Sequence, residues 1–178
     1  MAPGKKGAHV LIAGAGPVGM ISALVLAKAG IKVSIFERRN ELAEDLRAST
    51  FHPPTLDMIA RIDATLSTDL HSQGLIARHT QFRDRKSGVI AQFDAEVLRG
   101  DTDHPYRLQC EQWKMTRLIR DRLAAFPEVT LSLEARVMGL EQDAGGVTLK
   151  IERDGATETH RGDWLIGADG AWSAVRTA

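Results

Sequence analysis

The chain has 178 residues, a length that fits one domain of ordinary size or two small ones. Its 23 Lys and Arg residues balance its 23 Asp and Glu residues, which argues against nucleic acid as a partner, because binding phosphates requires a basic surplus. The single cysteine, Cys110, excludes an internal disulfide and favours a reducing compartment, for which we expect the cytoplasm. No apolar run reaches the roughly 18 residues that a membrane span needs, so no membrane partner is expected.

The first forty residues have the pattern of a βαβ unit. Residues 9–13 form a short apolar run that predicts a buried parallel strand. Apolar residues then repeat at helical spacing over residues 17–29, and Gly30 ends the helix. Residues 31–36 alternate and are β-branched, which predicts a second strand. A right-handed crossover makes the two strands parallel neighbours.

The middle of the chain is less regular. Pro53 and Pro54 predict a helix that runs to about Ile62, since proline suits the first turn of a helix. Residues 78–83 and 88–94 flank a turn and predict a β-hairpin that lies outside the main sheet. A further amphipathic helix is expected over residues 112–125.

The last third is rich in strands. Four alternating segments predict strands at 129–133, 135–142, 146–153 and 156–161, and residues 163–168 form another apolar strand. Together with the βαβ unit, this pattern predicts a Rossmann-like α/β domain that binds FAD or NAD(P), with three layers. An antiparallel β-meander precedes its last parallel strand.

The segment GAGPVG at 14–19 follows the first strand and opens the first helix, which is the context of a dinucleotide-binding loop. Gly14 permits a tight turn, Gly16 lets the backbone approach a pyrophosphate, and Gly19 lets helix and strand pack closely. The free N–H groups of the helix N-terminus, where Pro17 and Val18 lie, then face the phosphates.

Glu37 ends the second strand 18 residues after Gly19, where a carboxylate can accept hydrogen bonds from both ribose hydroxyls. A carboxylate there would repel a 2′-phosphate, so FAD or NAD is expected as the bound dinucleotide rather than NADP. For the adjacent Arg38, stacking on the adenine and plain solvation are both open.

The stretch GADGAWSAVR at 167–176 follows the last strand. Together with GAGPVG, it resembles the flavoprotein aromatic hydroxylases of the p-hydroxybenzoate hydroxylase type, which pair a GxGxxG loop with a later DGxxSxxR motif. Asp169, Gly170, Ser173 and Arg176 match that later motif. The resemblance implies that Asp169 contacts the pyrophosphate side of FAD.

The resemblance also implies cofactor contacts between the two motifs. Arg47 matches an arginine that reaches the flavin, although an ion pair with a neighbouring acidic residue is an open alternative from sequence alone. Gln112 matches a glutamine that contacts the cofactor, and helix capping is its alternative. Val137 matches a position that offers only its backbone to the adenine edge. Residues 75–105 match part of the family's substrate-binding region, inserted in the FAD-binding domain.

The resemblance implies that the complete protein is a monooxygenase that uses FAD, consumes NADH or NADPH, and hydroxylates a small aromatic, phenolic substrate with O2. The cofactor supplies this chemistry, and the sequence shows no catalytic acid or base. Members of the family continue well beyond the second motif, whereas this chain stops at Ala178. Residues 1–178 are therefore expected to be the N-terminal part of an FAD-binding domain, and the apolar surface thus exposed predicts self-association.

Three alternatives stay open. A flavoenzyme of the same superfamily that epoxidises or reduces an alkene would carry both motifs. An NAD-linked dehydrogenase would share GAGPVG and Glu37 but would have no use for the second motif. The chain could also be a non-catalytic dinucleotide-binding fragment.

Other residues are expected to be structural. The six histidines lack closely spaced acidic or thiol partners, so no metal site is expected. Cys110 has no flanking basic residue and is expected to be a buried, inert thiol. Core or interface positions are expected for Trp113, Trp164 and Trp172.

Overall fold

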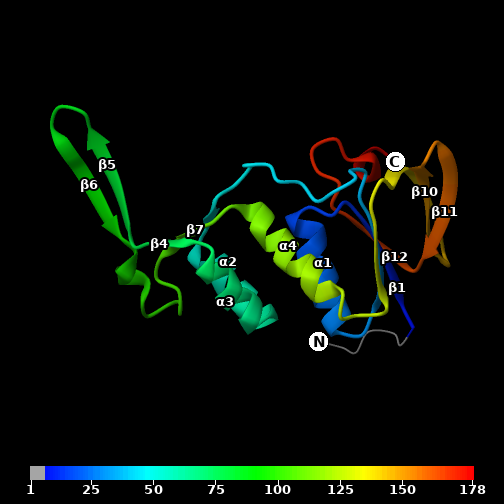
Figure 1. Ribbon diagram of the computed structural model, residues 1–178, viewed down its shortest axis with the longest axis horizontal. Coiled ribbons are helices and arrows are strands. Elements are labelled where there is room, and N and C mark those ends of the chain that lie inside the picture. The colour runs from blue at the N-terminus through cyan, green and yellow to red at the C-terminus, as the bar shows by residue number, and fades with distance from the viewer. Residues whose placement is uncertain (1–6) are drawn as a thin grey trace. The chain divides into compact units, whose positions relative to one another are not determined.

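The computed structural model describes residues 7–178, which divide into two compact units (Figure 1). The first unit comprises Met1–Glu44 and Ile119–Ala178, and the second comprises Asp45–Leu118. The division falls within helix α4 (Gln112–Leu123). Among residues 7–178, no helix is both long and apolar enough to serve as a transmembrane span.

The centre of the first unit is a four-stranded parallel sheet in the order β12-β1-β2-β8. Its strands are β1 (His9–Ala13), β2 (Lys32–Phe36), β8 (Val129–Ser132) and β12 (Trp164–Gly167). Helix α1 (Pro17–Lys28) connects β1 to β2, with proline in its first turn and Gly30 at a φ of +71° after its end. The predicted βαβ unit is confirmed.

A three-stranded antiparallel meander, in the order β11-β10-β9, packs against this sheet. It consists of β9 (Arg136–Asp143), β10 (Gly146–Arg153) and β11 (Ala156–Gly162). Buried side chains from both sheets form the common core: Leu11, Phe36, Ala135, Val147, Leu149 and Ile151. Helix α1 lies on the other side of the parallel sheet (Figure 1). The three-layer architecture, with the meander before the last parallel strand, is confirmed.

The second unit contains a small sheet in the order β3-β7-β4 and two helices. The strands are β3 (Thr50–Phe51), β4 (Leu75–Ala77) and β7 (Arg107–Gln109), and the helices are α2 (Pro53–Ile62) and α3 (Ala64–Ser72). The Asp63 side chain accepts a hydrogen bond of 2.8 Å from the backbone N–H of Leu66 and so caps α3. Buried side chains of this unit include Phe51, Leu56, Ile59, Leu66, Leu70 and Leu108.

The hairpin of the second unit is a separate two-stranded sheet, as predicted. It consists of β5 (His79–Asp84) and β6 (Gly88–Asp94), and the 3-10 helix η1 (Ala95–Leu98) follows it. Phe82 and Phe93 face each other across the strands with ring centroids 5.9 Å apart, yet both side chains are about 60% exposed. The hairpin therefore has an apolar face open to solvent.

Several expectations need correction. Helix α3 and the β3-β7-β4 sheet were not predicted, and helix α4 ends at Leu123 rather than residue 125. Trp164 and Trp172 are 69% and 88% exposed, so a core position is wrong for both. Trp172 lies in the loop before the short helix α5 (Ala174–Thr177), where no strand or helix covers it.

Candidate cofactor site

The glycine-rich loop lies at the carboxyl end of β1, and Gly16 is the N-cap of α1. Gly14 has a φ of +96°, a conformation that other residues rarely adopt. Its N–H donates to the carbonyl oxygen of Phe36 at 2.8 Å, which ties the loop to the end of β2. The loop, the helix N-terminus and the second strand therefore meet at one edge of the sheet, as a dinucleotide site requires.

The two sequence motifs touch each other. Strands β1 and β12 are parallel neighbours, with Ala13 opposite Gly167, and the N–H of Ala168 donates to the carbonyl oxygen of Ala13 at 2.8 Å. A Cβ atom on Gly14 would lie only 2.5 Å from the carbonyl oxygen of Ala168. The backbones on either side are so close that only glycine fits.

The other two glycines of the loop have opposite surroundings. A Cβ atom on Gly19 would overlap the carbonyl oxygen of Gly14, so this glycine permits close packing of helix and loop. A Cβ atom on Gly16 would meet nothing within 4 Å. The space above Gly16 is where a pyrophosphate can approach the backbone, next to the first-turn N–H groups of α1 that have no partner within the helix. Pro17 and Val18 form that first turn, and Val18 is 63% exposed.

Glu37 turns its carboxylate toward the loop. Its Oε2 accepts a hydrogen bond from the Ala15 N–H at 2.9 Å, and its Oε1 accepts one from the Arg39 N–H at 3.1 Å. Each carboxylate oxygen has two acceptor positions, so the group retains capacity for ribose hydroxyls. The neighbouring Arg38 is exposed.

Asp169 follows β12 directly, next to the loop. Its Oδ2 accepts hydrogen bonds from the N–H groups of Ala174 and Val175 at 2.7 and 3.2 Å. Burial acts to raise its pKa, but hydrogen bonds from Ser173 and from nearby backbone N–H groups outweigh burial and hold the pKa below the usual value. Its Oδ1 is buried without a hydrogen-bond partner among the described residues. A buried acceptor of this kind is expected to receive a ligand hydrogen bond.

In the second unit, Arg47 and Gln112 come close through backbone pairing. The antiparallel pairing of β3 with β7 continues beyond both strands, so that the Gln112 N–H donates to the carbonyl oxygen of Ala48 at 2.9 Å. The two residues, 65 positions apart in sequence, thus lie at one end of this ladder. The Arg47 guanidinium also forms an ion pair of 2.8 Å with its acidic neighbour Asp45, which was the alternative expected from the sequence. Both side chains of that pair are exposed.

The remaining candidate residues are more ordinary. Val137 lies in β9 opposite Ile151, and its side chain packs against the core of the first unit. Cys110 is buried, as expected, and burial raises the pKa of its thiol, which favours the protonated, less reactive form. No group of three or more His, Cys, Asp and Glu side chains within residues 7–178 is placed to hold a metal ion.

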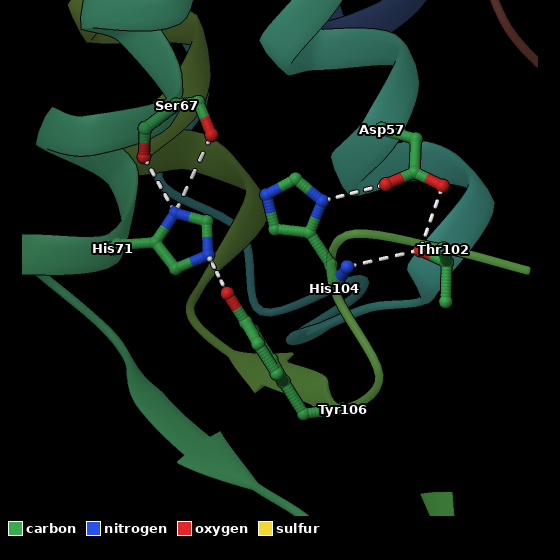
Figure 2. Close-up of polar contacts among 6 residues, drawn as sticks. All are labelled: Asp57, Ser67, His71, Thr102, His104 and Tyr106. Atoms are coloured by element: carbon green, nitrogen blue, oxygen red, sulfur yellow. Dashed lines mark hydrogen bonds and ion pairs between the residues drawn. The ribbon is translucent and has the colours of Figure 1, made fainter. Parts of the chain in front are cut away.

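Sequence analysis missed one polar cluster entirely. Asp57, Thr102 and His104 form one hydrogen-bonded group in the second unit, and Ser67, His71 and Tyr106 form another (Figure 2). Ring contacts of His104 with His71 and Tyr106 join the two groups. The members of the cluster come from α2, α3 and the loop before β7, so their spacing in sequence gives no signal.

Three features of the first unit suit a bound FAD. The space above Gly16 is open, the Glu37 carboxylate can accept further hydrogen bonds, and Oδ1 of Asp169 is buried without a hydrogen-bond partner among the described residues. These groups match the needs of a dinucleotide, whose phosphates seek N–H donors and whose hydroxyls seek acceptors.

Two curated relatives of the chain are monooxygenases by name. The chain is 34% identical over 167 residues to para-nitrophenol 4-monooxygenase of Pseudomonas sp. (strain WBC-3), which covers 94% of this chain and 41% of that relative. It is also 34% identical over 168 residues to the 6-hydroxy-3-succinoylpyridine 3-monooxygenase of Pseudomonas putida, with 94% and 42% covered. The chain thus spans less than half the length of these relatives.

The solved structures agree. The crystal structure of p-nitrophenol 4-monooxygenase from Pseudomonas putida DLL-E4 superposes with a TM-score of 0.89 at 31% identity, covering 94% of this chain and 42% of that one. The model of the FAD binding domain family matches residues 7–178, which is nearly the whole chain. The chain therefore belongs to the FAD binding domain family, and it spans less than half of the length of the relatives named above.

Proposed function

We propose that the complete protein is an FAD-dependent monooxygenase that uses NADH or NADPH and O2 to hydroxylate a small aromatic compound with a phenolic hydroxyl. The observation that carries this proposal is the contact between Gly14 and Ala168, which brings the dinucleotide loop and the second motif to one edge of the sheet. When bound, FAD supplies the transfer of electrons from the nicotinamide donor to O2 and the insertion of one oxygen atom.

The chain's own residues bind and orient the cofactor. In this proposal the backbone at Gly14 and Gly16 and the N-terminus of α1 receive the pyrophosphate, since anions bind where helix N–H groups are free. Glu37 accepts from ribose hydroxyls, and Arg38 covers the adenine. Asp169 lies on the pyrophosphate side of FAD. Its Oδ2 is held by backbone N–H groups, and its Oδ1 accepts a hydrogen bond from the ligand or from a bridging water.

Arg47 and Gln112 are proposed to contact the flavin side of the cofactor. Their support is the resemblance, together with their placement at one end of the β3–β7 ladder. Val137 is proposed to contact the adenine edge of FAD through its backbone alone, because its side chain packs against the core of the first unit. Residues 75–105, which contain the exposed hairpin, are proposed to belong to the substrate-binding region.

The substrate class is proposed from two names. The relatives that share 34% identity are named for para-nitrophenol and for 6-hydroxy-3-succinoylpyridine, both ring compounds with a hydroxyl group. A ring made electron-rich by its hydroxyl is a suitable acceptor for an oxygen atom. The choice between NADH and NADPH as electron donor is a separate question, because Glu37 is proposed to bind the resident FAD and not the electron donor.

For the 178-residue chain by itself we propose FAD binding without turnover, because it spans only 41–42% of the two relatives named above. We also propose that it self-associates. Strand β12 is an edge of the parallel sheet and carries Trp164, which is 69% exposed, and sheet edges with apolar side chains favour pairing between chains. A cytoplasmic location remains part of the proposal, in keeping with a single buried thiol.

The test uses both the 178-residue chain and the full-length protein. The 178-residue chain is mixed with FAD, and binding is measured by quenching of flavin fluorescence; the full-length gene product is then assayed for NADH and NADPH oxidation with phenols and with alkenes. Phenol-stimulated oxidation with a hydroxylated product supports the proposal. Stimulation by alkenes alone would favour an epoxidase or reductase, and full-length protein without flavin would overturn the assignment.

A further inference from the structure

The polar cluster of the second unit, formed by Asp57, Ser67, His71, Thr102, His104 and Tyr106, has no part in the cofactor site proposed above (Figure 2). Its first half joins α2 to the loop before β7. The Nδ1 of His104 donates to Oδ1 of Asp57 at 2.6 Å, and the Thr102 hydroxyl donates to Oδ2 at 2.7 Å. The side chains of His104 and Asp57 are only 14% and 17% exposed. Such a charge-assisted bond is strong when it is shielded from water.

The second half joins α3 to the same loop. The Nδ1 of His71 lies 2.6 Å from the carbonyl oxygen of Ser67, which can only accept, so Nδ1 carries a proton. The Nε2 of His71 is then paired with the Tyr106 hydroxyl at 2.9 Å. The rings of His71 and His104 stack with centroids 5.5 Å apart, and Tyr106 meets both of them edge-on at 5.8 Å. Both halves thus form one connected unit.

The charges around the cluster hold it in place. Arg61 on α2 faces Asp57, and the guanidinium of Arg78, between β4 and β5, lies 5.7 Å from the centre of the Tyr106 ring. Hydrogen bonds from His104 and Thr102 hold the pKa of Asp57 below its usual value, so this carboxylate stays charged until the solution is more acidic than an ordinary aspartate requires.

The cluster is connected to the backbone that places Gln112. Tyr106 immediately precedes β7, whose Leu108 is fully buried between β3 and β4. Beyond β7, the Cys110 N–H donates to the carbonyl oxygen of Ser49 at 2.9 Å, and the Gln112 N–H donates to that of Ala48. Fixing the start of this strand therefore fixes its register against β3, and with it the place of Gln112 beside Arg47.

We propose that Asp57, His71, His104 and Tyr106 are positioning residues, which anchor the start of β7 to α2 and α3 and thereby hold Gln112 beside Arg47. This inference rests on the proposed function in one respect, namely that Gln112 and Arg47 contact FAD. The side chains of the cluster touch no cofactor residue themselves and act through the strand.

The experiment measures amide hydrogen exchange by NMR in the 178-residue chain, followed by FAD affinity. In Asp57→Ala the N–H groups of Cys110 and Gln112 are expected to exchange at least about tenfold faster, because the loss of a charge-assisted bond lets the strand open. The N–H groups of β2 in the first unit should not change. Asp103→Ala is the matched control, since this exposed aspartate precedes His104 in the same loop.

Conservative variants separate positioning from general damage. Tyr106→Phe removes a single hydroxyl and keeps the ring, and it should accelerate exchange at Gln112 less than Asp57→Ala does. Asp57→Asn keeps an acceptor for His104 and should restore part of the protection. In His104→Phe the pKa of Asp57, followed by carboxyl carbon shifts, should move up toward the ordinary value.

The outcomes are distinct. Unchanged exchange at Gln112 in folded Asp57→Ala or Tyr106→Phe protein would overturn the positioning role. If exchange increases and FAD affinity falls at least about fivefold, both the role and its link to the cofactor are supported. If exchange increases while the wild-type 178-residue chain binds no FAD, positioning holds and the proposed FAD binding by this chain fails instead.

Discussion

The contact between Gly14 and Ala168 makes a strong prediction about stability. In Gly14→Ala, the new methyl group would be forced against the Ala168 carbonyl oxygen at 2.5 Å, at a residue whose φ is +96°. The left-handed backbone costs an alanine about 1–2 kcal/mol, and overpacking costs about 1–3 kcal/mol. We therefore expect Gly14→Ala to lower the free energy of unfolding by about 2–5 kcal/mol.

Two other glycines serve as matched controls. Gly30 has a φ of +71° but nothing within 4 Å of its Cβ position, so Gly30→Ala carries only the backbone cost of about 1–2 kcal/mol. Gly16 is the N-cap of α1 with open space around it, so Gly16→Ser should leave stability unchanged or slightly higher. The serine hydroxyl would nevertheless occupy the space of the pyrophosphate and bond to a first-turn N–H, so FAD affinity should fall at least about tenfold.

Urea unfolding, followed by circular dichroism, measures the three stabilities, and flavin fluorescence measures the affinities. The loss of unfolding free energy in Gly14→Ala must exceed that in Gly30→Ala, because only the first substitution adds steric overlap with the Ala168 carbonyl oxygen. Equal losses would refute the close approach of the two motifs. Likewise, Gly16→Ser with normal FAD affinity would mean that no phosphate lies above this residue.

Three more predictions concern the first unit. Glu37→Gln should weaken FAD binding about tenfold, measured by fluorescence titration, because a neutral amide is a poorer acceptor for hydroxyls and for the Ala15 N–H. Hydrogen bonds hold the pKa of Asp169 below its usual value. The ionised carboxylate therefore contributes its full stabilisation above about pH 4, and this contribution is lost as the pH falls through the lowered pKa. In urea unfolding at different pH values, Asp169→Asn should remove this part of the loss of stability in acid. Trp164→Lys should shift the 178-residue chain toward monomer in light scattering, and an unchanged mass would exclude the β12 edge as the contact.

Much of the first unit is predictable because its signals are local. The strand at 9–13, the glycine loop and the strand at 31–36 follow one another in sequence, and each has a local signal: an apolar run, a glycine motif and an alternating β-branched segment. The meander strands are joined by tight turns, at Gly155 for example, so neighbouring segments pair. The segment near residue 130 was expected as a strand, but its membership of the parallel sheet depends on pairing with β2, about 95 residues away.

The second unit is harder to predict because its contacts are distant. Strands β3, β4 and β7 have only two or three residues each, too few to show a period, and Thr50 pairs with Gln109. For the same reason, the histidines were treated as isolated in sequence, although His104 bonds to Asp57 across 47 residues. The glycines and Asp169 were recognisable because a motif names them, whereas no motif names the cluster.

The close fit of Gly14 against Ala168 also bears on the order of events during synthesis. The loop is translated about 150 residues before strand β12, which leads into its other wall at Ala168. At about 10 residues per second, a ribosome would need about 15 seconds to deliver that strand. Until then the nascent loop has α1 and the end of β2 as neighbours, and the wall formed by Ala168 is completed only when β12 pairs with β1.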